Sequence, residues 1–207
     1  PRLPHPRFLG KSGMGTRGDA IVQFDWAVGE ILKALDETGK AADTMVVFTS
    51  DNGPVVDDGY KDEAVAKLGS HKPAGPFRGG KYSKFEGGTR VPFIVRWPGK
   101  VKPGESAALV CQIDFVASFA ALVGRQGAIA TARDSQNVLQ ALLGEAPRGR
   151  ETLIEQGNGL AVRRGQWKFI PASQGAKVAR PTNTELGNDS GPQLYDLEAD
   201  PGETRNV

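Results

Sequence analysis

The feature that most constrains the fold of this chain is a helical pattern of apolar residues that is followed closely by an uninterrupted apolar strand. Apolar residues recur at helical spacing from Asp19 to about Thr38, and Gly39 follows where a helix-ending glycine is expected. Residues 44–49 (TMVVFT) come a few positions later and form a continuous, β-branched apolar run. Such a run is typical of a strand that is buried on both faces of a parallel sheet. The sequence therefore predicts an α/β fold in which helices cover the sheet.

More predicted strands and helices follow up to about residue 146, and short strands separated by turns follow after it. Residues 91–97 (VPFIVRW) predict a second strand, and residues 114–123 and 135–143 predict helices. After Pro147, short strand-like segments alternate with turns, at residues 152–155, 160–162, 167–170 and 193–197. We therefore expect two units: the carboxyl-terminal part of an α/β domain in residues 1–146, and a small α+β subdomain with an antiparallel sheet in residues 147–207. Residues 171–192 are polar and predict a surface excursion without regular structure.

Composition excludes several classes of protein. The 207 residues contain 26 Lys and Arg against 24 Asp and Glu, so the net charge is only +2. Cys111 is the single cysteine, which excludes an intrachain disulfide, and no apolar stretch is long enough to predict a membrane span. The first residue is Pro1 rather than Met. We therefore expect the natural N-terminus, with any signal peptide, to lie upstream.

The small net charge hides one strongly basic, glycine-rich segment. Residues 71–102 contain eight lysines and arginines and a single acid, Glu86, which gives a local charge of +7. Aromatic residues interleave with the charges, as they do on surfaces that bind single-stranded nucleic acid. The glycines of the segment instead indicate a backbone wrapped closely around something small; they are Gly79, Gly80, Gly87 and Gly88. We therefore favour a compact anionic ligand.

Two phosphate-loop patterns occur without the context that they require. Residues 13–18 spell G-x-G-x-x-G, but no strand pattern leads into them. Residues 75–81 spell G-x-x-x-x-G-K, but Tyr82 stands where the metal-binding hydroxyl of a nucleotide loop is required. Neither pattern therefore predicts a nucleotide site.

Ser50-Asp51-Asn52-Gly53-Pro54 follows the apolar strand directly. In open α/β sheets, ligands bind at the carboxyl ends of the strands. The Asp51 carboxylate and the Asn52 carbonyl are two hard oxygen ligands, suited to Ca²⁺ or Mg²⁺. A plain Asx turn that closes the strand explains the same residues equally well.

Three segments together resemble a known family. TMVVFTSDNGP, GPFRGGKYSKFEGGTRVPFIVRWPGKVKPG and QLYDLEADPGE, in this order, resemble the carboxyl-terminal half of a type I sulfatase. These formylglycine-dependent enzymes belong to the alkaline-phosphatase-like superfamily. The resemblance implies part of a sandwich with a mostly parallel sheet flanked by helices, Ca²⁺ ligands at Asp51 and Asn52, and a sulfate-contacting, catalytic Lys81. It also implies hydrolysis of a small-molecule or carbohydrate sulfate ester in the periplasm or outside the cell.

Other parts of that family pattern do not occur in this sequence. The family forms its formylglycine nucleophile from the Cys of a C-x-P-S-R motif, whereas Cys111 lies in Val-Cys-Gln-Ile. We therefore expect the nucleophile and the remaining Ca²⁺ ligands upstream, and no activity from these 207 residues alone. The sulfate-contacting His of the family would also lie upstream, which leaves His5 a structural or surface role. His71 is either an exposed loop residue or a substrate-binding residue that acts as a general acid.

Two alternatives to a sulfatase stay open at the level of sequence. A phosphate or phosphonate monoester hydrolase of the same superfamily would use the same metal and lysine. A non-catalytic module that binds glycosaminoglycan or nucleic acid would use the whole basic segment. With the sulfatase interpretation, no nucleic-acid partner is expected.

Overall fold

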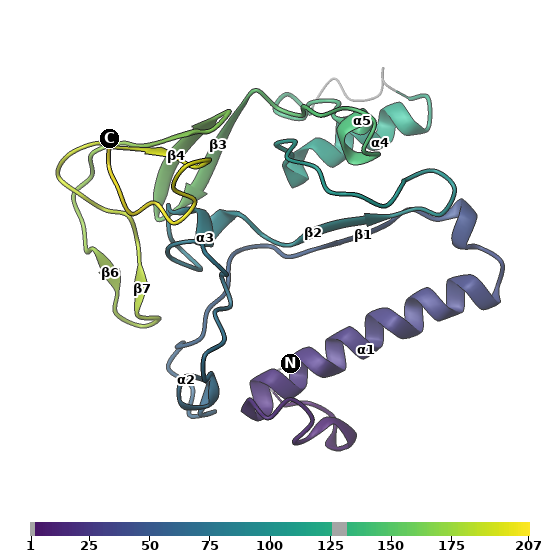
Figure 1. Ribbon diagram of the computed structural model, residues 1–207, viewed down its shortest axis with the longest axis horizontal. Coiled ribbons are helices and arrows are strands. Elements are labelled where there is room, and N and C mark those ends of the chain that lie inside the picture. Colours follow the sequence, from purple (N-terminus) through teal and green to yellow (C-terminus); the bar gives the residue numbers. More distant parts are fainter. Residues whose placement is uncertain (1–2, 126–131) are drawn as a thin grey trace.

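The computed structural model describes residues 3–125 and 132–207 (Figure 1). Pro1 lies outside the described residues. The elements follow in chain order, with η denoting a short 3₁₀ helix: η1 Pro6–Phe8, α1 Gly15–Glu37, η2 Ala41–Asp43, β1 Val46–Thr49, α2 Ala64–Lys67, α3 Glu86–Thr89, β2 Phe93–Arg96, η3 Gln112–Asp114, α4 Phe115–Leu122, α5 Leu139–Leu142, β3 Thr152–Gly157, β4 Gly159–Arg164, β5 Trp167–Ile170, β6 Val178–Ala179, β7 Thr184–Glu185 and β8 Gln193–Asp196. The predicted α/β class is confirmed.

Strands β1 and β2 form a two-stranded ribbon between helices. In Figure 1, α1 lies on one side of this ribbon, and α4 and α5 lie on the other. The ring centroids of Phe24 on α1 and Phe48 on β1 lie 5.6 Å apart, and those of Phe93 on β2 and Phe115 on α4 lie 6.0 Å apart. The helices thus cover both faces of the ribbon.

The direction of this strand pair differs from the expected parallel arrangement. β1 and β2 are antiparallel, with Val46 opposite Arg96 and Thr49 opposite Phe93. The reason lies in the connection between them. The glycine-rich segment folds back onto the turn after β1, so the chain enters β2 at the same end of the ribbon at which it leaves β1. The carboxyl end of β1 and the start of β2 therefore meet at one place.

Helix α1 is longer than its predicted core, and Gly39, with a φ of +68°, follows its C-cap Thr38 as expected. The predicted apolar stripe is only partly covered. Ile21 is 64% exposed and Ile31 is 59% exposed, whereas Leu32 is half-buried. No helix within residues 3–125 and 132–207 has both the length and the apolar character that crossing a membrane requires.

The predicted carboxyl-terminal antiparallel sheet is confirmed. Its strands lie in the order β3-β4-β5-β8, and each pair is antiparallel. Buried residues of this sheet form one core cluster with Phe85, which precedes α3, and Leu197, which follows β8; the sheet residues are Ala161, Ile170 and Tyr195. The excursion between β5 and β8 is more regular than expected, because it contains the short β6–β7 hairpin. The boundary between residues 146 and 147 stays a prediction.

A second core forms around α4 and α5. Val138, Ala141 and Leu142 are buried there against aromatic residues that include Phe115. α5 is shorter than the helix predicted for residues 135–143, because Ser135 and the segment after it instead bond back to α4 and η3. The fully buried Asp114 carboxylate accepts hydrogen bonds from the guanidinium of Arg150 at 2.6 and 2.7 Å. This pair ties the segment that leads into β3 to the start of α4.

Candidate functional site

The turn after β1 presents oxygen atoms that the described part of the chain leaves largely unused. Asp51 is exposed and Asn52 is half-buried. The Asn52 amide nitrogen donates to the carbonyl of Gly53 at 2.9 Å, and the Asn52 side-chain oxygen accepts no hydrogen bond within the described residues. The Asp51 carboxylate accepts one long hydrogen bond, 3.4 Å from the Ser50 hydroxyl. A carboxylate and an amide oxygen side by side, both available, fit a hard divalent cation.

These two residues do not complete a metal site. Within residues 3–125 and 132–207, no group of three or more His, Cys, Asp or Glu side chains is arranged to hold a metal ion. Ca²⁺ takes about six to eight oxygen ligands. Asp51 and Asn52 can therefore supply at most part of a coordination shell, and their role as metal ligands stays a prediction.

The glycine-rich segment packs main chain against main chain on this turn. The Gly53 N–H donates to the carbonyl of Gly88 at 2.9 Å, and the Lys81 N–H donates to the carbonyl of Pro54 at 2.9 Å. A Cβ at Gly53 would overlap the carbonyl oxygen of Gly87, and a Cβ at Gly80 would lie 2.7 Å from that of Pro54. These glycines therefore permit close contact between two protein segments. Of the glycines expected to wrap around a small ligand, Gly80, Gly87 and Gly88 would each bring a Cβ within 3 Å of a backbone oxygen of the protein, and the wrapping itself stays a prediction.

Lys81 is held by its backbone while its ammonium stays available. Its N–H bond to Pro54 places it beside the turn that carries Asp51 and Asn52. The next residue, Tyr82, has a φ of +77°, and its carbonyl accepts from the Asn158 N–H at 2.6 Å. Such a conformation is rare for a non-glycine residue and persists only where the surroundings enforce it. In the described part of the chain, the Lys81 ammonium has no carboxylate partner and lies 5.4 Å from the Tyr82 ring centroid.

His71 does not join this group. Its side chain is exposed, and its backbone N–H donates to the carbonyl of Leu68 at 3.2 Å. The loop that precedes it is fixed to the start of α1, where Arg17 donates to Asp62 at 2.6 Å. Within the described ranges, His71 makes no hydrogen bond to Asp51, Asn52 or Lys81. Its substrate-binding role stays a prediction.

The other basic residues of the glycine-rich segment do not form one anion-binding face. Arg78 pairs with Glu185, Arg90 lies 3.6 Å from Glu86, and Arg96 lies 3.5 Å from Asp36. The structural ion pairs expected for Arg78 and Arg90 are confirmed. Lys84 is buried on another side of the segment. Three of the eight cations are thus held in ion pairs, whereas the ammonium of Lys81, whose backbone is fixed beside the turn, has no carboxylate partner in the described part of the chain.

A cavity of about 1180 Å³ opens next to the turn. Asp51 and Asn52 belong to its lining, together with β2, residues 101–113, part of β3, and the cations Arg90 and Arg163. The site therefore borders a space that is large enough for an extended ligand.

A buried cluster of charged side chains connects Glu86 of the glycine-rich segment to the carboxyl-terminal part of the chain. The fully buried Lys168 lies 3.0 Å from Glu86, 2.7 Å from Glu155 and 3.8 Å from Glu203. The Glu86 N–H donates to the Glu203 carboxylate at 2.6 Å, and Arg163 donates to the Glu86 carboxylate at 3.0 Å. The cluster thus joins α3 to the carboxyl-terminal sheet.

Burial changes the pKa values of two carboxyl groups in this cluster. Burial raises the pKa of Glu203 to about 7, although the Lys168 charge opposes the shift. Burial also raises the pKa of Glu155. Sequence reasoning missed the cluster. The available signal was Glu86, the only acid within the basic segment.

Comparison with known proteins agrees with this architecture. The sulfatase family model matches residues 5–125. The chain is 54% identical to an N-acetylgalactosamine-6-O-sulfatase of Bacteroides thetaiotaomicron, over all of this chain and 41% of that protein. It is 36% identical to the steryl-sulfatase of Mus musculus, over 97% of this chain and 35% of that protein.

A solved structure from work on the metabolism of multiple glycosaminoglycans by Bacteroides thetaiotaomicron superposes with a TM-score of 0.96 at 54% identity, over all of this chain and 44% of that one. The chain therefore spans about two fifths of the length of the first curated relative. By its sequence over residues 5–125 and by these relatives, the chain belongs to the sulfatase family.

Proposed function

We propose that the protein carrying this chain hydrolyses sulfate esters of carbohydrates. The observation that carries the proposal is the hydrogen bond from the Lys81 N–H to the carbonyl of Pro54, which fixes the backbone of Lys81 beside the turn that carries Asp51 and Asn52. Membership of the sulfatase family supports the reaction class. The 54% identity to an N-acetylgalactosamine-6-O-sulfatase supports a 6-sulfated amino sugar as the substrate class. By the same resemblance, we propose that the protein acts in the periplasm or outside the cell.

In this proposal, the residues of the chain neutralise and orient the sulfate group. Lys81 would donate hydrogen bonds to sulfate oxygens, and its charge would stabilise the negative charge that develops as the S–O bond breaks. Asp51 and Asn52 would supply two oxygen ligands to Ca²⁺. When bound, such a cation would polarise the sulfate and orient the attacking group. The family's C-x-P-S-R motif does not occur in this sequence, so we assign the nucleophile to none of these residues.

Variants of Lys81 and Asp51 test the proposal. Lys81→Ala and Asp51→Ala should each lower kcat/KM for release of sulfate from 6-sulfated N-acetylgalactosamine by at least about a hundredfold, the effect expected when one group that stabilises developing charge is removed. Lys100→Ala removes an exposed lysine of the same basic segment and should leave the rate unchanged. Near-normal rates in either site variant would overturn the proposed roles.

Metal dependence is tested separately from turnover. The wild-type protein should lose thermal stability after chelation and recover it with Ca²⁺, because the cation binds only the folded site. Asp51→Ala should respond to neither treatment. A wild-type protein that recovers with Mg²⁺ but not with Ca²⁺ would contradict the assignment of the metal while leaving the metal site in place.

The same preparations distinguish the two alternatives. Phosphate or phosphonate monoester hydrolysis that exceeds sulfate release would favour the related hydrolase. A distributed binder of nucleic acid or glycosaminoglycan is disfavoured by the pairing of Arg78, Arg90 and Arg96 with carboxylates. Binding to heparin or single-stranded DNA that survives Lys81→Ala, without any turnover, would nevertheless support it.

A further inference from the structure

We propose that Lys84 is the anchor of a second ligand site, which binds the carboxylate of an acidic sugar between the β3–β4 turn and the segment after β5. The site lies in a pocket of about 360 Å³ whose lining does not include Asp51, Asn52 or Lys81. It does not depend on the proposed hydrolysis, because its expected ligand needs no sulfate ester.

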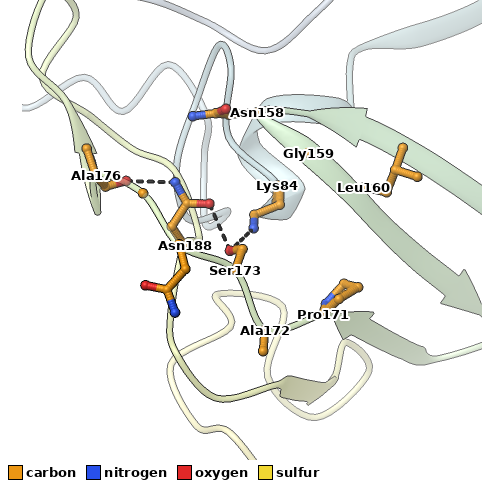
Figure 2. Close-up of a pocket in the computed structure, with 11 residues that line it drawn as sticks. Lys84, Asn158, Gly159, Leu160, Pro171, Ala172, Ser173, Ala176 and Asn188 are labelled. Atoms are coloured by element: carbon orange, nitrogen blue, oxygen red, sulfur yellow. Dashed lines mark hydrogen bonds between the residues drawn. The ribbon is translucent and has the colours of Figure 1, made fainter.

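The first argument is the state of Lys84. Only 2% of this residue is exposed, yet in the described part of the chain its ammonium has no carboxylate partner. Its one hydrogen bond runs to the hydroxyl of Ser173 at 2.8 Å. Figure 2 shows the side chain reaching Ser173 across the pocket. An ammonium has three N–H donors, and a buried charge without a counter-ion is costly. Two donors and one positive charge therefore remain for a ligand.

The hydrogen bonds around Ser173 show that its hydroxyl cannot neutralise that charge. The Ser173 hydroxyl donates to the side-chain oxygen of Asn188 at 3.0 Å, and the Asn188 amide donates to the carbonyl of Ala176 at 2.8 Å. All these partners are neutral (Figure 2). In agreement with this, burial lowers the pKa of Lys84. By contrast, the ammonium of the other fully buried lysine, Lys168, lies within 4 Å of three carboxylates.

The second argument is the composition of the pocket. Besides Lys84 and two glycines, its lining combines three side-chain amides and one hydroxyl with four apolar residues: Asn158, Gln174 and Asn188, then Ser173, then Leu160, Pro171, Ala172 and Ala176. Amides donate and accept hydrogen bonds in the way that sugar hydroxyls require. The volume lies near the lower end of the range for small-molecule sites, which fits one sugar unit. The lining contains no acidic residue.

Two glycines keep the pocket open. A Cβ at Gly159 would lie 3.8 Å from the Lys84 ammonium nitrogen and 3.3 Å from its Cδ, and a Cβ at Gly175 would lie 3.0 Å from the Asn188 amide nitrogen. Both glycines have positive φ angles, +134° and +148°, which other residues rarely adopt. The chain therefore leaves space beside the polar atoms that would contact a ligand.

Titration calorimetry with small probes tests the site at constant ionic strength. Glucuronate should bind the wild-type protein at least about tenfold more tightly than glucose, which is the gain from one hydrogen bond to a charged group. Lys84→Met should remove this difference. Lys177→Met is the matched control, since it removes an exposed lysine of the adjacent segment, and it should bind like the wild type. Lys81→Ala should also bind like the wild type, which separates this site from the proposed catalytic one.

Each other outcome overturns the proposal. The first is equal affinity for glucuronate and glucose, and the second is an equal loss of glucuronate affinity in Lys84→Met and Lys177→Met. The third is inorganic sulfate that binds through Lys84 as tightly as glucuronate, because the pocket would then be a simple anion site without sugar recognition. If Lys84→Met does not fold, wild-type crystals soaked in glucuronate decide. A carboxylate within hydrogen-bond distance of the Lys84 ammonium supports the site, and an empty pocket at saturating glucuronate overturns it.

Discussion

Replacement of Glu203 by Gln tests whether the buried cluster makes the stability of the protein depend on pH. Glu203 is fully buried, and one of its carboxylate oxygens has no hydrogen-bond partner in the described part of the chain. Its pKa in the folded protein is about 7, against 4.5 for the ordinary side chain. The folded state therefore binds more protons than the unfolded state between these pH values. By linkage, stability falls as the pH rises through this window.

The size of the effect follows from the two pKa values. Each pKa unit corresponds to about 1.4 kcal/mol, so the shift of Glu203 amounts to about 3 kcal/mol between pH 4 and pH 8. Gln keeps an oxygen that can accept the Glu86 N–H, but it carries no titrating proton. Relative to the wild type, Glu203→Gln should therefore gain about 3 kcal/mol of unfolding free energy as the pH rises from 4 to 8.

Urea denaturation of the protein carrying this chain at several pH values measures the effect. Hydrogen exchange of the Glu86 amide, which donates to Glu203, reports the same change locally. Glu198→Gln, at an exposed position, is the control and should follow the wild type at every pH. If the wild type and Glu203→Gln lose the same free energy between pH 4 and pH 8, Glu203 is not the group that holds the proton.

Three further substitutions test packing and buried charge. Gly53→Ala should cost about 3 kcal/mol or more, because its Cβ would overlap rigid backbone, whereas Gly104→Ala meets open space and should change little in the same urea titration. Lys168→Met leaves the buried carboxylates of Glu155 and Glu203 without a cation, while Glu86 keeps Arg163, and it should cost about 3–5 kcal/mol at pH 8, with a smaller loss at pH 5. An equal loss at both pH values would contradict this. Arg150→Met should cost a similar amount, whereas Arg164→Met at an exposed pair should cost less than about 1 kcal/mol by thermal unfolding.

Local pattern was sufficient for most elements. Helical spacing after Asp19 and the terminal Gly39 located α1, and alternation with turns located the strands of the carboxyl-terminal sheet. The position of Asp51 and Asn52 directly after β1 also follows from sequence order alone. These features depend on neighbours within a few residues, which a sequence displays directly.

Features that depend on distant partners could not be predicted in the same way. The antiparallel direction of β2 depends on how the glycine-rich segment folds back, and one-dimensional periodicity does not record that path. Lys84 and Lys81 have the same chemistry three positions apart, but one is buried against Ser173 and the other lies beside Pro54. A charge count treats both as part of one basic run. Only the packing separates them.

The backbone contact between Gly53 and Gly88 also has a consequence for the order of folding. Its two halves are separated by the whole excursion that contains α2, so the loop must close before the contact can form. Contacts of this kind form late, since the entropy of loop closure is lost before any bond is gained. We therefore expect Lys81 to join Asp51 and Asn52 in one late step of folding, after β1 and α1 have formed, so that a partly folded chain lacks the assembled site.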